Sequence, residues 1–234
     1  MNRSDHVVLD SHGEFPSGRS ITAATDRRRR SSRHLGPTEG LALGIFVVAT
    51  VGFGVYGWTT GAPSTVAYLF TVLAVATITV ACWDGAAPRW VPVALAVLAA
   101  GHLAGGMVRV GNDVLYNASF GTPALRYDHL VHSSAVFLGT IVLWTMFIPP
   151  AGRSARSPRL LAVCLLAGLG LGALNETIEF LTTLAHHGAH VGGYVNTGWD
   201  LVSNVAGAVG AGLYIGAARP VGDPGAAAPR MSAT

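Results

Sequence analysis

The chain has 234 residues, of which 50% are hydrophobic and only 12% are charged. A soluble globular domain is about 25% charged, so this composition argues against an ordinary soluble protein. All fifteen basic residues are arginines, and the excess positive charge lies mainly in the amino-terminal tail, which holds seven of them, so we do not interpret the basic balance as a nucleic-acid-binding surface. The two cysteines imply no disulfide framework.

Residues 1–38 are polar, rich in serine and arginine, and without hydrophobic periodicity. We expect a disordered cytoplasmic tail whose basic run, Arg27–Arg33, lies against anionic lipid headgroups. A cleaved twin-arginine signal is the alternative. The apolar run that follows is long for a signal and no small-x-small cleavage site follows it, so we favour the tail.

Apolar segments of membrane-spanning length then follow one another along the chain. About 20 apolar residues in a helix cross the hydrocarbon core of a bilayer, and uninterrupted hydrophobicity at this length is not a strand pattern. The sequence therefore predicts an all-α protein, a polytopic transmembrane bundle over residues 39–219. The six predicted helices are 40–58, 64–83, 90–108, 129–148, 160–180 and 200–217. Residues 220–234 are rich in proline, glycine and alanine and are expected to form a second disordered cytoplasmic tail.

The arginines predict the orientation of this bundle. With six helices and a cytoplasmic amino terminus, thirteen arginines lie on the cytoplasmic side, against only Arg109 and Arg126 outside. The positive-inside rule therefore places both termini in the cytoplasm. The absence of lysine and the abundance of alanine, glycine and valine indicate a GC-rich bacterial genome, so we expect a multi-pass protein of the bacterial inner membrane.

Polar residues interrupt the last three apolar segments at one common depth. At 1.5 Å per residue, the glutamates of "ALNETIEFL" lie about 25 to 30 Å from Arg159, close to the outer interface. The 129–148 and 200–217 segments begin at that interface with "RYDHLVH" and "GWDLVSN". The predicted polar cluster comprises Asp128, His129, His132, Glu176, Glu179, Asp200 and Asn204.

The spacing of these residues indicates where they point. Asp128 and His132 lie four positions apart on a helix, as do Asp200 and Asn204, so each pair shares a helix face. Ionisable side chains within a membrane usually face the bundle interior. Carboxylates and imidazoles gathered in this way suit a divalent metal such as Zn²⁺, Mn²⁺ or Fe²⁺. The hypothetical metal ligands are Asp128, His132, Glu176, Glu179 and Asp200.

Each of these features also has a simpler interpretation. Asp128 and Asp200 begin their predicted helices and could cap them, and the two glutamates could be interfacial residues in contact with water. His102 and Arg109 on the preceding segment could join the cluster, Arg109 as a counter-charge. The loop "AHHGAHVGGYVNTG" is either solvated surface or a lid over the site, carrying His186, His187 and His190.

Small residues predict how the last two helices pack. The runs "GLGLG" at 168–172 and "GAVGAG" at 207–212 let neighbouring membrane helices approach closely. We interpret both runs as packing faces that bring the 160–180 and 200–217 segments together.

The order of polar motifs over residues 127–204 resembles that of the VanZ-like and YjdF-like families of small bacterial membrane proteins. It consists of "YDHLVH", then "NETIEF", then a glycine-rich loop leading to "GWDLVSN". The pair Trp199-Asp200 and the helices before the motif make the YjdF-like resemblance the closer one. The resemblance implies a role that faces the cell envelope and names no reaction.

Two functions remain open. The first is binding of a lipid-linked or envelope-associated ligand, or of a cation, at the outward-facing polar site. The alternative is a metal-dependent membrane hydrolase or lipid-modifying enzyme that acts at the outer leaflet. The chain lacks the H-E-x-x-H, G-x-S-x-G and phosphate-loop motifs of well-known enzymes, which favours binding.

Overall fold

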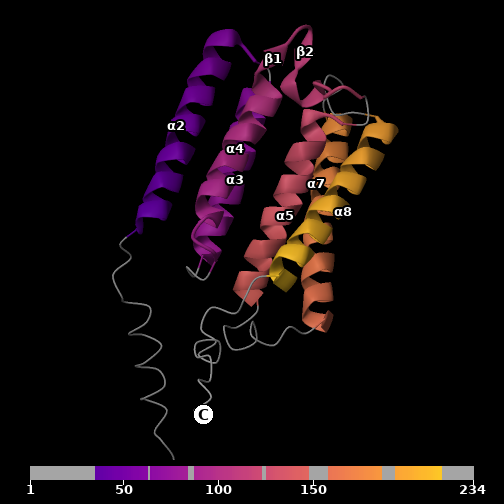
Figure 1. Ribbon diagram of the computed structural model, residues 1–234. Coiled ribbons are helices and arrows are strands. Elements are labelled where there is room, and N and C mark those ends of the chain that lie inside the picture. The colour runs from indigo at the N-terminus through magenta and orange to yellow at the C-terminus, as the bar shows by residue number, and fades with distance from the viewer. Residues whose placement is uncertain are drawn as a thin grey trace, which may run out of the picture. The chain divides into compact units, whose positions relative to one another are not determined.

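The computed structural model of the chain describes residues 35–62, 64–83, 87–122, 125–147, 158–185 and 193–217. Long helices dominate these residues, which confirms the all-α class (Figure 1). The predicted lid histidines, the residues 220–234 and the Arg27–Arg33 run lie outside the described residues. The helices are α2 (Pro37–Thr60), α3 (Thr65–Cys82), α4 (Val91–Met107), α5 (Tyr127–Phe147), α7 (Pro158–Ala185) and α8 (Tyr194–Ala217).

Several of the described helices have the length and composition of membrane spans. Three are long and apolar enough to cross a bilayer, over Pro37–Thr60, Tyr127–Met146 and Pro158–Thr182. The apolar stretches of α3 and α4 are shorter, at Thr65–Ala81 and Val91–Met107. Helix α8 has 24 residues but carries several polar side chains in its first half. That α3, α4 and α8 also cross the membrane stays a prediction.

Proline and glycine set the ends of these helices. Pro37 and Pro158 are the first residues of α2 and α7, where the missing N–H costs nothing and the fixed φ suits a helix. Gly61 follows α2 with a φ of +67°, the left-handed conformation that commonly ends a helix.

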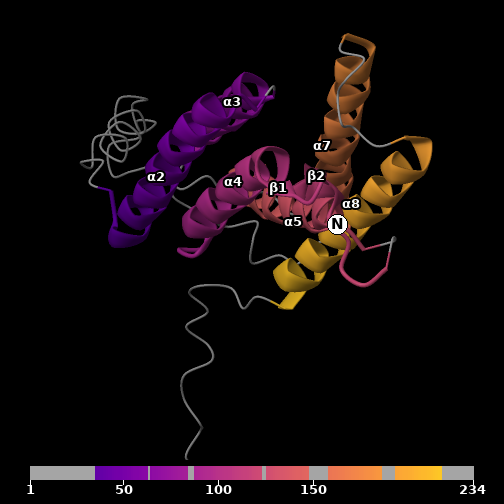
Figure 2. The ribbon, with the colours of Figure 1, turned by 90° about the horizontal axis from the view of Figure 1, so that it is seen from above.

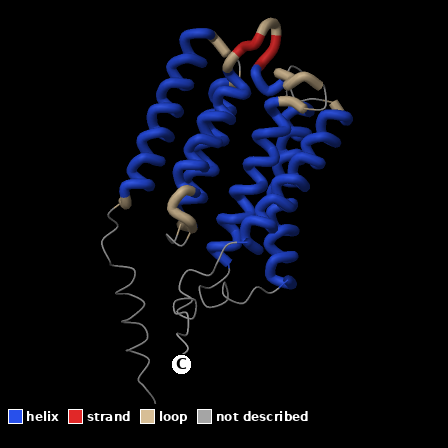
Figure 3. The backbone as a smooth tube through the Cα atoms, viewed as in Figure 1, coloured by secondary structure: helices blue, strands red, loops and turns tan. Residues whose placement is uncertain are grey.

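The connection from α4 to α5 is more ordered than the loop that the sequence predicts. It contains an antiparallel hairpin of β1 (Arg109–Val110) and β2 (Asp113–Val114), followed by the 3₁₀ helix η1 (Leu115–Asn117). Gly111 turns the hairpin with a φ of +62°, as a two-residue hairpin loop requires. Figure 3 shows that the strands occupy one end of the bundle, the end at which α5 begins.

Helix α5 is the centre of the carboxyl-terminal part of the bundle. It packs against α4, α7 and α8, while α2 and α3 pack against α4 (Figure 2). A Cβ on Gly207 would collide with the backbone oxygen of Ser133, so α8 lies directly on the backbone of α5. Gly172 packs against Asn204, which joins α7 to α8. The predicted glycine faces therefore seat α8 on α5 as well as on α7.

The distribution of side chains is the reverse of that in a soluble protein. On α8, Leu213 is 71% exposed and Val202 is 56% exposed, whereas Asp200 is 1% exposed and Asn204 is 2% exposed. Exposed apolar surface on this scale is typical of a protein in contact with lipid. A bilayer stabilises a bundle with an apolar exterior and a polar interior. The apolar side chains then contact lipid, and the polar groups pair with one another inside the bundle.

Candidate functional site

The polar residues singled out in the sequence come together where α5 begins, α7 ends and α8 begins. Helix α8 starts at Tyr194, because the N–H groups of Asn196 and Thr197 donate to the carbonyl of Gly193. The predicted start near residue 200 is therefore wrong. Asp200 lies in the second turn of α8 and Asp128 lies inside α5, so neither residue is the N-cap of its helix.

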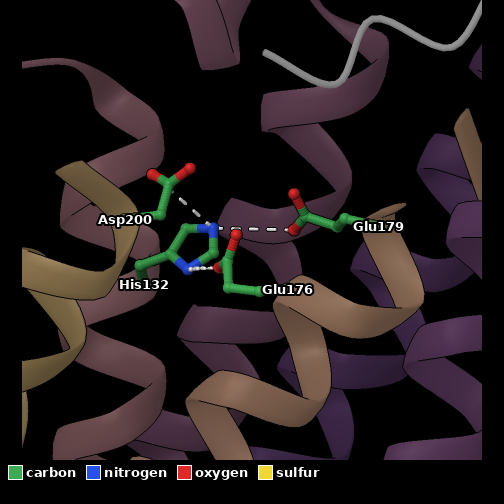
Figure 4. Close-up of side chains that lie close together, drawn as sticks. All are labelled: His132, Glu176, Glu179 and Asp200. Atoms are coloured by element: carbon green, nitrogen blue, oxygen red, sulfur yellow. Dashed lines mark ion pairs between the residues drawn. The ribbon is translucent and has the colours of Figure 1, made fainter. Parts of the chain in front are cut away.

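The imidazole of His132 is the centre of the cluster (Figure 4). Its Nδ1 lies 3.2 Å from Oε1 of Glu176. Its Nε2 lies 3.4 Å from Oδ1 of Asp128, 3.6 Å from Oε1 of Glu179 and 3.9 Å from Oδ1 of Asp200. One histidine of α5 thus lies within 4 Å of four carboxylates from three helices.

Three of these distances are longer than an ordinary N–H···O hydrogen bond, and the fourth, from Nδ1 to Glu176, is at the upper limit of the range. A charge-assisted N–H···O bond is about 2.7–2.9 Å long, and none of the four His132 distances falls in that range. Neighbouring ligands around a metal with bonds of about 2.1 Å are separated by roughly 3.0–3.4 Å. One ligand atom from each of His132, Glu176, Glu179 and Asp200 lies within 4.8 Å of the other three. The four residues are therefore close enough together to be candidate ligands of one ion.

Asn196 forms hydrogen bonds with both aspartates, a role that the sequence did not predict. Its Nδ2 donates to Oδ2 of Asp200 at 2.7 Å and to Oδ2 of Asp128 at 3.2 Å. A guanidinium nitrogen of Arg126 donates to Oδ1 of Asn196 at 3.0 Å, which fixes the orientation of the amide. Each aspartate thus has one oxygen held by Asn196 and the other facing His132.

His129 is a second imidazole beside Asp200. Its Nδ1 accepts a hydrogen bond from the backbone N–H of Arg126, so the ring proton of neutral His129 is on Nε2. That Nε2 lies 3.7 Å from Oδ1 of Asp200. The side chain is 4% exposed and its ring lies 6.3 Å from the ring of Trp199.

The negative charge of the cluster has few partners. Within the part of the chain that the structure describes, the ion-pair partners of the four carboxylates are His129 and His132. Arg109, a predicted counter-charge, instead donates to the backbone oxygen of Asn112 in the hairpin. Burying carboxylates without compensating charge is costly, so the cluster favours an additional cation or bound protons.

Burial is uneven across the cluster. Asp200 is 1% exposed, His132 is 6% exposed and Glu176 is 9% exposed. The side chains of Asp128 and Glu179 are 16% and 30% exposed. The cluster is therefore closed on the Asp200 side and partly open on the Glu179 side.

An aromatic group from α3, α4 and η1 lies near this open side. The hydroxyl of Tyr116 forms a hydrogen bond with Nδ1 of His102 at 2.5 Å, and Tyr68 packs edge-on against the same imidazole at 5.2 Å. Burial raises the pKa of the Tyr116 phenol well above its usual range, so the hydroxyl keeps its proton. Asp128 and Glu179 contribute to this rise in the pKa of Tyr116, which is consistent with their carboxylates lying near the phenol. The tyrosines gave no signal in the sequence, because isolated aromatic residues are common in any apolar core.

Asn204 lies one helical turn from Asp200, further from the end of α8. It packs against Gly172 of α7. Its amide nitrogen and oxygen are buried and have no hydrogen-bond partner among the described residues. Asn204 therefore faces the interior between α7 and α8 and is not one of the groups around His132.

Comparison with known proteins identifies one family. Residues 41–220 match the model of a family described as predicted membrane protein (DUF2238). No curated protein and no solved structure matches the chain.

Proposed function

The chain belongs to the DUF2238 family of predicted membrane proteins, and from the geometry of its polar cluster we propose that it binds a divalent cation inside its helix bundle. The cation is held by His132 and the carboxylates around it, at the end of the bundle that carries the β1–β2 hairpin. In this proposal that end faces outward from the bacterial inner membrane, and the cation is the point of attachment for an envelope-associated or lipid-linked ligand. The resemblance to VanZ-like and YjdF-like proteins supports an envelope-facing role.

A single observation carries the proposal, which is the spacing of four carboxylates around one imidazole. The carboxylates lie 3.2–3.9 Å from the ring nitrogens of His132, which is at or beyond the upper limit of an N–H···O hydrogen bond and close enough to share an ion. The mutual repulsion of four carboxylates, two of them buried and two partly exposed, favours more positive charge than one protonated imidazole supplies. A divalent cation would compensate two of these charges at their centre.

The type of ligand narrows the choice of metal. Imidazole nitrogen suits Zn²⁺ and Fe²⁺, and carboxylate oxygen suits Mn²⁺, so a site that combines them fits these three ions. Cys164 plays no part, since it is buried elsewhere, against Trp144 of α5. Soft ions that prefer thiolate are therefore not expected.

A metal-dependent hydrolase or lipid-modifying enzyme is the second candidate. The observation that favours it is the 30% exposure of Glu179, which leaves one side of the proposed ion accessible to water and substrate. A bound metal lowers the pKa of its water and generates a nucleophile at neutral pH. Both candidates share the metal and differ only in whether that water reacts.

The test is the metal content of the protein purified in detergent without chelators. We expect stoichiometric Mn²⁺, Fe²⁺ or Zn²⁺ in the wild type and a large loss in the double variant Glu176→Gln/Glu179→Gln. Added metal should also stabilise the wild type, by about 2.7 kcal/mol at one hundred times the Kd. The variant Glu39→Gln, which removes a glutamate of α2 outside the cluster, is the matched control.

Protein without stoichiometric metal, combined with a Gln variant of undiminished thermal stability, would rule out the metal. In that case one or more carboxylates hold protons, and the cluster binds a ligand through hydrogen bonds.

A further inference from the structure

The two ring nitrogens of His132 face different carboxylates. Nδ1 faces Glu176 alone, whereas Nε2 faces Asp128, Glu179 and Asp200. The two nitrogens of one imidazole point in different directions and cannot bind the same ion. In Figure 4 the dashed line to Glu176 starts at one ring nitrogen, and the dashed lines to Glu179 and Asp200 start at the other. The four carboxylates are therefore not equivalent.

From this division we infer that Glu176 is not a metal ligand but a positioning residue that accepts the Nδ1–H of His132. The ion then lies on the Nε2 side, where its ligands are His132, Asp128, Glu179 and Asp200. This inference rests on the proposed function and assigns a role to each residue of the site. Metal-binding histidines usually donate their second ring N–H to a carboxylate or carbonyl, which fixes the tautomer and makes the ligating nitrogen more basic.

The burial of Glu176 supports this role. It is 9% exposed, and its Oε1 has no hydrogen-bond donor among the described residues other than the nearby Nδ1 of His132. A proton on Nδ1 would satisfy this oxygen and would leave the lone pair of Nε2 for the ion. The opposite tautomer would place a proton on Nε2, against the three other carboxylates, and would remove the nitrogen ligand.

The aspartates provide a second, independent observation. The side chain of Asp200 is 1% exposed. Its Oδ1 has no hydrogen-bond donor among the described residues and faces Nε2 of His132. Oδ2 of the same carboxylate is held by Asn196 at 2.7 Å. Asp128 repeats the arrangement, with Oδ2 bonded to Asn196 and Oδ1 facing Nε2. A buried carboxylate with one oxygen anchored and the other without a donor is prepared for a cation.

The inferred ligand set is one nitrogen and three carboxylate oxygens. It contains more oxygen than a structural zinc site and so favours Mn²⁺ or Fe²⁺. Glu179 is the most exposed of the ligands, so further coordination positions for water or a ligand oxygen would open on its side.

Titration of the purified full-length protein with Co²⁺ tests the inference, because the visible absorption of bound Co²⁺ changes when a ligand changes. Glu176→Gln keeps an oxygen that accepts the Nδ1–H. We expect it to weaken Co²⁺ binding about 10- to 100-fold and to leave the band positions unchanged. Glu176→Leu removes the acceptor and should weaken binding further.

The ligand variants should behave differently. Asp128→Asn should shift the Co²⁺ bands and weaken binding more than Glu176→Gln does. Folding of Asp128→Asn is checked by size-exclusion chromatography. If this variant does not fold, Glu179→Gln, at the more exposed position, replaces it as the ligand variant. His102→Gln replaces a histidine of α4 outside the ligand set and is the control, with Co²⁺ affinity and spectrum expected to match the wild type.

The outcomes separate the inference from the proposed function. A wild-type protein that binds no Co²⁺, Mn²⁺, Fe²⁺ or Zn²⁺ overturns both. A wild type that binds Co²⁺ while Glu176→Gln shifts its bands as strongly as Asp128→Asn or Glu179→Gln makes Glu176 a ligand, which overturns the inference alone. Unchanged Co²⁺ bands in both Asp128→Asn and Glu179→Gln would also overturn the inference alone.

Discussion

Asn196 shows how a neutral side chain can organise a charged site. Its amide nitrogen lies between Asp128 and Asp200, and its amide oxygen is held by Arg126. Arg126 therefore acts on the carboxylates only through the amide and does not neutralise them. The arrangement keeps the two aspartates close together and leaves their negative charge available to a cation.

Replacing Asn196 by alanine should therefore weaken metal binding without removing a ligand. We expect a loss of about 10- to 100-fold in affinity, the usual effect of removing a residue that orients metal ligands. Isothermal titration of the purified protein with Mn²⁺ measures it. Asn117→Ala is the matched control, because Asn117 also donates its amide to an aspartate, Asp113, but on the exposed hairpin connection. Equal affinities in the two variants would contradict the role assigned to Asn196.

The sequence predicted the depth of the polar residues but not the contribution of Asn196. The depth follows from the helical rise, and counting from Arg159 is enough to place Glu176 and Glu179 near the same membrane edge as Asp128. Asn196 stands in "GGYVNTG", whose composition is typical of a loop. Its role depends on contacts with α5, nearly 70 positions earlier in the chain, and local composition carries no information about such contacts.

At the scale of the helices, the close approach of α8 to α5 positions the site. Gly207 of α8 lies on the backbone oxygen of Ser133, one residue after His132. Asp200 is seven residues before Gly207 and therefore lies on the same face of α8, two turns nearer the end of the helix. Any increase in the distance between the two helices would move Asp200 away from Nε2 of His132.

Gly207→Ala should therefore reduce both stability and metal binding. The new methyl group cannot fit beside Ser133, and overpacking of this kind costs about 1–3 kcal/mol. Gly216→Ala in the same helix is the control. No atom lies within 4 Å of its added methyl group, so we expect unchanged or slightly higher stability. Thermal unfolding in detergent, with and without Mn²⁺, measures both effects. An unaffected melting temperature in Gly207→Ala would contradict this account of the packing.

Most helix bounds were predictable, and the exceptions have local causes. Apolar length predicts α2, α3, α4 and α5 to within a few residues. Helix α8 begins six residues before the predicted start. Its first turns are polar and contain glycine, so apolar length does not indicate them. Hydrogen bonding by Asn196 holds these turns instead of apolar packing. The hairpin after α4 was missed because each of its strands has only two residues, too few to show alternation.

At the scale of the whole molecule, the bundle encloses charge and exposes hydrocarbon. Its exterior carries large apolar side chains such as Trp58, 85% exposed, and Phe70, 71% exposed, while the buried residues Glu176 and Asp200 lie beside His132. In water this distribution would be unstable, and in lipid it separates the polar cluster from the surrounding hydrocarbon. The membrane is thus part of the reason that the carboxylates stay together. Their position near one end of the helices makes the orientation of the bundle decisive for function.

The orientation can be tested by cysteine labelling of intact cells. The positive-inside rule predicts that the hairpin end faces outward and that the carboxyl end of α8 faces the cytoplasm. Figure 1 shows these two places at opposite ends of the bundle. The variants Asn112→Cys at the hairpin turn and Ala217→Cys at the last residue of α8 are made in a background that lacks Cys82 and Cys164. Both positions are exposed, so accessibility within the protein does not limit either reaction.

A membrane-impermeant maleimide should label Asn112→Cys in intact cells and should label Ala217→Cys only after the cells are opened. The arginine distribution is the physical reason, because thirteen of the fifteen arginines then lie on the cytoplasmic side. The opposite labelling pattern would place the His132 cluster at the cytoplasmic face. A cation site there would exchange with the cytoplasm, and the envelope-facing part of the proposed function would be lost while the metal chemistry remained. Labelling at both positions in intact cells would mean that an even number of the described helices, instead of all three, crosses the membrane between them. The short apolar stretches of α3 and α4 lie before both positions, so a helix that does not cross would have to be α5, α7 or α8. Of these three, α8 is the one that is not among the long apolar spans.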